Sequence, residues 1–148
     1  MRIEAVSIED LFQKSGNKEE LIRLLDRIIT EEAPGLERQF FSGPSITMIG
    51  YGEMPWNTAS ASGTWPVISL APQKDTVNLY IAAEKEGKPL PSFYIEDFGK
   101  SAVGKSCVRI RSVKTLKKEA LISLIRETVQ WADAEKNRYG RRCAAKTE

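Results

Sequence analysis

The stretch Gly99–Val113, which reads GKSAVGKSCVRIRSV, decides the fold. Its first part, Gly99–Ser106, matches G-x-x-x-x-G-K-[ST], the phosphate-binding loop of many nucleotidases. In such a loop a helix begins directly after the Lys-Ser pair, and the amides of its first turn bind the phosphates. Here Cys-Val-Arg-Ile-Arg follows Ser106, and this alternation with a period of two predicts a strand. We therefore expect a glycine-containing turn that leads into a strand, not a nucleotide-hydrolysing site.

Two interpretations of this turn remain open. Its lysines can simply be solvated, as most charged side chains are. Alternatively, the loop amides can form a small anion site together with Lys100, Lys105 and Arg109.

The composition describes an ordinary globular protein. The chain has 148 residues, of which 41% are hydrophobic and 28% charged, and this is enough for one domain with a core. The 22 basic and 20 acidic residues give a net charge of +2, too balanced for a typical nucleic-acid binder. Neither a membrane-spanning run nor a signal peptide is recognisable, so we expect a cytoplasmic protein that contacts neither nucleic acid nor membrane.

Histidine is absent and there are two cysteines, Cys107 and Cys143. The lack of histidine removes the commonest general base and the favoured transition-metal ligand. The two cysteines have no further ligand at motif spacing, so a structural zinc is not expected. These absences favour a non-enzymatic protein without a resident cofactor.

Helical patterns lie at both ends of the chain. Ser7 can cap a short first helix and Asn17 a second, whose apolar stripe repeats at helical spacing and which Pro34-Gly35 ends. The stripe consists of Leu21, Leu24, Leu25, Ile28 and Ile29. Thr115 can cap a long last helix that reaches about Lys136.

Strand patterns fill the middle. They cover 46–51, 65–70, 76–82 and 107–113, and the polar stretch 56–64 is expected to be a loop or a poor edge strand. The fold class is therefore α+β, with an antiparallel sheet packed against N-terminal helices and a long C-terminal helix in a single compact domain. We expect this domain to cover 1–136 and a flexible basic tail to cover 137–148.

Four segments resemble the YdhG-like domain family, namely 49–52 (IGYG), 65–71 (WPVISLA), 77–80 (VNLY) and 98–110 (FGKSAVGKSCVRI). This bacterial family of domains of unknown function includes a frataxin-like intracellular iron chaperone. The resemblance covers about Val6 to Trp131, and the chain departs from it at 53–64. It implies a compact α+β fold and a Gly-Lys-Ser-Cys stretch unconnected with nucleotide hydrolysis.

Aromatic and basic residues give the first functional hypothesis, a domain that binds a small anion or metabolite at one face of the sheet. Its candidate ligand-binding residues are Tyr51, Trp56, Trp65, Tyr80, Lys100, Lys105, Ser106 and Arg109. The alternative is that these aromatic side chains only fill the core or cover the sheet.

The resemblance implies a second hypothesis, an iron chaperone whose carboxylates are hard oxygen ligands. The candidate metal ligands are Glu19, Glu20 and Asp26 on the second helix. The alternative is a solvated helix face, because Glu19 and Arg23 lie at ion-pair spacing. A third hypothesis is a protein-interaction module, for which a homodimer is one form.

Overall fold

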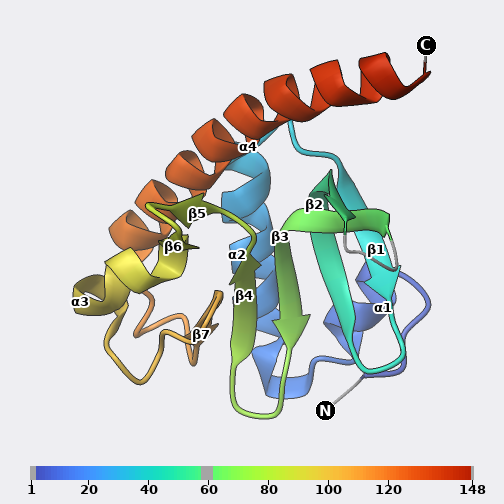
Figure 1. The fold of residues 1–148 in the computed structure, drawn as a ribbon. Coiled ribbons are helices and arrows are strands. Elements are labelled where there is room, and N and C mark those ends of the chain that lie inside the picture. The colour runs from blue at the N-terminus through green and yellow to red at the C-terminus, as the bar shows by residue number, and fades with distance from the viewer. Residues whose placement is uncertain (1–2, 58–61, 148) are drawn as a thin grey trace.

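The computed structural model describes residues 3–57 and 62–147, with side chains at 3–54 and 63–134. Five strands form one antiparallel sheet in the order β1-β2-β3-β4-β7, and α2 and α4 lie on the same side of it, behind the sheet in Figure 1. This arrangement confirms the α+β prediction. The elements in chain order are α1 (Ile8–Gln13), η1 (Gly16–Lys18), α2 (Glu19–Glu32), β1 (Arg38–Ser42), β2 (Thr47–Asn57), β3 (Ser62–Pro72), β4 (Val77–Ile81), β5 (Glu84–Lys85), β6 (Lys88–Pro89), η2 (Leu90–Tyr94), α3 (Ile95–Phe98), β7 (Cys107–Ile110) and α4 (Lys118–Thr147).

The cap of α1 is as predicted, whereas the cap of α2 is not. Ser7 Oγ accepts the Asp10 amide at 3.1 Å and caps α1. The prediction that Asn17 caps α2 is wrong, because Lys18 occupies the N-cap position and no side chain caps this helix. Asn17 lies inside the 3-10 turn η1, and this turn continues directly into α2.

One apolar core lies between the sheet and the helices. The buried residues of α2 are Leu21, Ile22, Leu25, Ile28 and Ile29. Ile22 was not in the predicted stripe, and Leu24, which was, is only half-buried. The buried stripe is therefore shifted toward Ile22, and α4, which packs against α2, contributes Leu121, Leu124 and Ile125 to the same core.

The sheet has one strand more than the four strand patterns in the sequence, and two of its strands are longer than these patterns. β1 was not predicted. β2 continues as far as Asn57 and β3 begins at Ser62, so the loop between them is shorter than the expected loop at 56–64. Residues 58–61 lie outside the described part of the chain. Asn57 pairs with Ser62, and this cross-strand pairing keeps small polar residues extended although their intrinsic strand preference is weak.

The hairpin formed by β2 and β3 bends back over the face of the sheet that the helices leave open, which we call the outer face. In the register, Trp65 pairs with Met54 of β2 and Phe41 pairs with Met48 of β2. These two partners are six positions apart, or about 20 Å along an extended strand. The two rings nevertheless meet edge to face, with centroids 5.6 Å apart. Figure 1 shows the first part of β3 crossing the sheet at a large angle to its later part. The positive φ of 74° at Gly52 lies at this bend.

The last strand and helix differ from prediction at their ends. β7 ends at Ile110 rather than Val113, and Thr115 does not cap α4. Instead, the Thr115 hydroxyl lies 2.9 Å from Ser112 Oγ in a turn, and α4 begins at Lys118. The helix continues past Lys136 to Thr147, and the flexibility of 137–148 stays a prediction. None of the helices, over the residues described, is long and apolar enough to cross a membrane.

Tyr94 anchors η2 to α4, and we expect it to make the stability depend on pH in the alkaline range. Its hydroxyl lies 3.1 Å from Ser123 Oγ and donates to Glu127. Burial, together with the Glu127 carboxylate that accepts the hydroxyl proton of Tyr94, raises the pKa of Tyr94 to about 12.

A raised pKa in the folded state gives stability that is present below about pH 10 and is lost as the pH rises toward 12. We expect unfolding midpoints in urea to fall between these pH values and to fall less steeply in Tyr94→Phe. An identical slope in both proteins would contradict this expectation.

Candidate functional site

The segment Gly99–Ser106 does not form a phosphate-binding loop. The extended strand β7, not a helix, follows Ser106, which confirms the prediction. The Gly104 amide donates to the Cys107 carbonyl at 2.9 Å, and Val103 forms a bridge with Val108. This part of the turn therefore bonds to the chain's own strand, and no helix N-terminus is available for a triphosphate.

Arg109 folds onto the same turn. A Cβ on Gly104 would lie 2.9 Å from the Arg109 Nη2 and 2.8 Å from Cys107 Sγ, so a larger residue there would have to displace these side chains. Arg109 Nη1 donates to the Ser101 carbonyl at 3.3 Å. Lys100 and Lys105 are exposed. The structure thus gives Arg109 a partner within the turn and does not bring the three basic candidates to one described cavity.

A groove at the upper end of the outer face brings together three of the eight predicted ligand-binding residues: Trp65, Tyr80 and Ser106. Its volume is about 460 Å³. Trp65 forms one wall and is 44% exposed, whereas Tyr80 is half-buried. The described residues that line it are Trp65, Pro66, Tyr80, Ile81, Ala82, Ala83, Glu84, Pro89 and Ser106.

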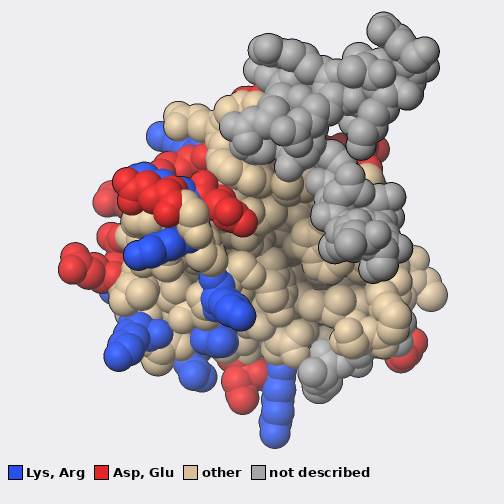
Figure 2. Space-filling view, in the orientation of Figure 1, with Lys and Arg blue, Asp and Glu red and all other residues tan. Residues whose placement is uncertain are grey.

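The register explains why these residues meet. Ser69 pairs with Tyr80 across β3 and β4, and Tyr80 pairs with Cys107 across β4 and β7, so Tyr80 faces away from the helices. The Asn78 side-chain amide donates to the Tyr80 hydroxyl at 3.3 Å and orients the ring. Figure 2 shows the outer face, where uncharged residues occupy the middle and many of the Lys, Arg, Asp and Glu side chains lie toward the left and lower margins.

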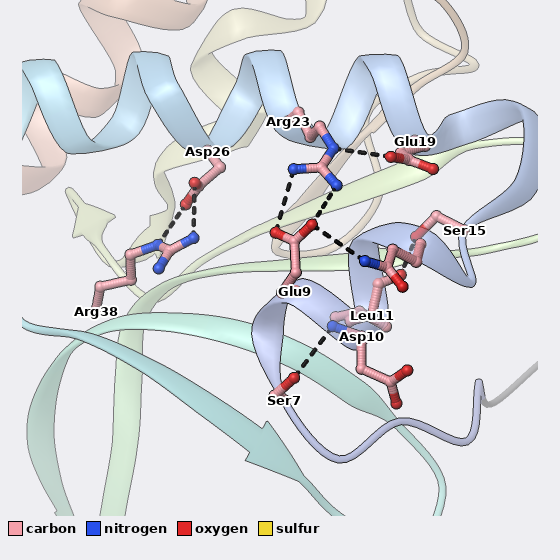
Figure 3. Close-up of polar contacts among 10 residues, drawn as sticks. Ser7, Glu9, Asp10, Leu11, Ser15, Glu19, Arg23, Asp26 and Arg38 are labelled. Carbon is pink, nitrogen blue, oxygen red and sulfur yellow. Dashed lines mark hydrogen bonds and ion pairs between the residues drawn. The ribbon is translucent and has the colours of Figure 1, made fainter.

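Tyr51 lies on the opposite face of the sheet, so it cannot line the groove. It is 1% exposed and its hydroxyl donates to Asp26 Oδ1 at 2.5 Å. Arg38 binds the same carboxylate through two nitrogens, at 2.8 and 2.9 Å, and Figure 3 shows this pair between α2 and β1. Burial, with the Asp26 charge adding to it, holds the pKa of Tyr51 far above its usual value. The network fastens α2 to the sheet.

The predicted metal ligands are spread along α2 and two of them bind arginines. Arg23 holds Glu19 at 2.9 Å and also Glu9 at 2.6 Å, as Figure 3 shows, while Asp26 is held by Arg38. Glu20 is exposed. Within the described residues no group of three His, Cys, Asp or Glu is placed to hold a metal ion. The geometry therefore favours the groove over an iron site on this helix.

Trp56 is part of β2, but its side chain lies outside the described residues. Sequence reasoning missed the groove residues Pro66, Ile81, Ala82, Ala83, Glu84 and Pro89. Two of them adjoin predicted site residues in the sequence, Pro66 beside Trp65 and Ile81 beside Tyr80, and this was the available signal. The others line the groove because β4 continues into the β5–β6 hairpin, where the Leu90 amide donates to the Ala83 carbonyl at 2.9 Å.

Fold and site together define a class: a compact α+β domain with an aromatic groove on the open face of an antiparallel sheet. Comparisons of the chain with family models, with curated proteins and with solved structures found no match. The resemblance to the YdhG-like family stays a prediction.

Proposed function

We propose that the protein is a non-enzymatic binding domain that takes a small metabolite with a planar aromatic ring into the groove between Trp65 and Tyr80. The observation that supports it is the exposed wall formed by Trp65, since a large aromatic ring at 44% exposure beside a cavity offers a stacking surface. The small side chain of Ala82, a half-buried residue of the lining, leaves room for a ring against that wall.

The polar groups of the groove favour a neutral or cationic ligand over an anion. Glu84 supplies a carboxylate and Ser106 a hydroxyl, and no Lys or Arg is among the described lining residues. An anionic ligand would meet the Glu84 charge at short range, which is unfavourable. We therefore place the ring against Trp65 and an amino or other hydrogen-donating group toward Glu84.

Two probes that share one ring and differ in charge test this proposal. Tryptamine carries an ammonium group and indole-3-acetate a carboxylate on the same indole. In titrations followed by the ¹⁵N–¹H resonances of the Ala82 and Ala83 amides, we expect tryptamine to bind more tightly. Glu84→Gln is expected to abolish the preference, and Trp65→Ala to weaken tryptamine binding about tenfold through lost stacking.

The matched control is Phe93→Ala, which removes an aromatic ring of similar exposure, 39%, that does not line the groove. It should leave tryptamine binding unchanged. Failure of both probes to shift the Ala82 and Ala83 resonances, or equal losses in the Trp65 and Phe93 variants, would refute the groove as an aromatic site.

A further inference from the structure

The two edges of the five-stranded sheet differ in how the chain covers them. β7 lies at one edge, and the turn before it fills that edge: the Arg109 amide donates to the Ala102 carbonyl at 2.7 Å and the Cys107 carbonyl accepts from Gly104. β1 lies at the other edge. Nothing comparable covers β1 within the described residues.

The hydrogen-bond pattern shows which backbone groups β1 presents. The Gly52 amide donates to the Glu37 carbonyl at 2.7 Å, and the Gly43 amide to the Ile46 carbonyl at 2.8 Å. In this register the odd-numbered residues of β1 are the hydrogen-bonded partners of β2. The backbone N–H and C=O groups of Arg38 and Phe40 therefore point away from β2, and within the described residues they have no hydrogen-bond partner.

The edge also has few of the features that usually prevent strand addition. Natural edge strands carry lysine, proline, a bulge or an inward-pointing charge. β1 reads RQFFS and pairs with β2 without a bulge. Its one charged residue, Arg38, points toward the helices, but Asp26 compensates its charge through two hydrogen bonds, so an added strand does not bury an unpaired charge.

We propose that β1 pairs in antiparallel fashion with β1 of a second copy of this chain, with the two-fold axis at Gln39. Arg38 then lies opposite Phe40 of the second copy, and Phe40 lies opposite Arg38 of the second copy. Each of these two pairs exchanges two backbone hydrogen bonds, so the free groups of both strands are satisfied. The two sheets become one continuous sheet.

The side chains in this register are compatible with a second copy. Gln39 faces its own equivalent on the outer face, where two amides can exchange hydrogen bonds. On the other face the Arg38 guanidinium lies beside the half-buried Phe40 ring of the second copy, an attractive cation–π geometry. Glu37 lies opposite Phe41, so like charges do not meet. A contact of five residues a side is small, and the dimer should be weak and concentration-dependent.

Charge-swap variants at the axis test the pairing by sedimentation equilibrium, with concentrations from about 1 µM to about 1 mM. We expect wild type to approach twice the monomer mass at the upper end. Gln39→Lys and Gln39→Glu each place like charges directly opposite and should weaken the dimer about fivefold or more. An equimolar mixture of the two variants should form a heterodimer tighter than either homodimer.

Ser101→Lys adds the same charge on an exposed residue beside the opposite edge and should dimerise like wild type. A wild type that stays monomeric over the whole range would overturn the proposal. So would Gln39 variants that dimerise like wild type, or a mixture no tighter than its components.

Discussion

Replacing Gly52 by alanine is expected to lower the free energy of unfolding by about 2–5 kcal/mol. Two effects add at this position. The φ of 74° is a left-handed conformation that strains any residue with a Cβ, and the new Cβ would lie 2.9 Å from Leu36 Cδ2 and 3.4 Å from Val67 Cγ2. Val67 belongs to the core and Leu36 packs against it, so moving either side chain disturbs the core packing and lowers the stability. Urea denaturation followed by circular dichroism measures the loss.

Gly87→Ala is the matched control. Gly87 has almost the same φ, 76°, but a Cβ there would meet nothing within 4 Å. It should cost about 1 kcal/mol from backbone strain alone. The difference between the two variants isolates the close approach at Gly52, and equal losses would show that this packing is not as tight as described.

Removing the carboxylate of Asp26 is the second large effect. Asp26→Ala leaves the Tyr51 hydroxyl buried without its acceptor and Arg38 without its bidentate partner, and should cost about 2–4 kcal/mol. The Asp26 side chain is only 14% exposed, so water replaces these contacts poorly. The same denaturation experiment measures this loss, and Tyr51→Phe should cost less because Arg38 keeps its partner.

Glu19→Ala serves as the comparison on the same helix. The Glu19–Arg23 pair is of similar length, 2.9 Å, but its side chains are 38% and 39% exposed. Exposed pairs contribute about 0–1 kcal/mol, and Arg23 retains Glu9. A loss for Asp26→Ala no larger than that for Glu19→Ala would contradict the structural role assigned to the buried network.

The predicted ligand-binding set shows where reasoning from the sequence stopped. It grouped Tyr51 with Tyr80, although Tyr51 shares the parity of Ile49, a core residue, and therefore faces the helices. The alternation of residues in the sequence therefore already indicated the position of Tyr51. The sequence did not indicate the position of Arg109, because the contact of Arg109 with Gly104 depends on how the turn folds back along β7.

Local pattern by itself determined the extended conformation after Ser106, the cap at Ser7 and the α+β class, because each follows from side-chain periodicity or from hydrogen bonds within a few residues. Only the tertiary structure decided that β1 exists, since five residues become a strand through pairing with β2. It also decided the groove: Trp65 and Tyr80 are fifteen positions apart in the chain and meet because the hairpin bends at Gly52 and the register aligns β3 with β4. Pairing between distant segments is a property of the whole chain, and no local pattern contains it.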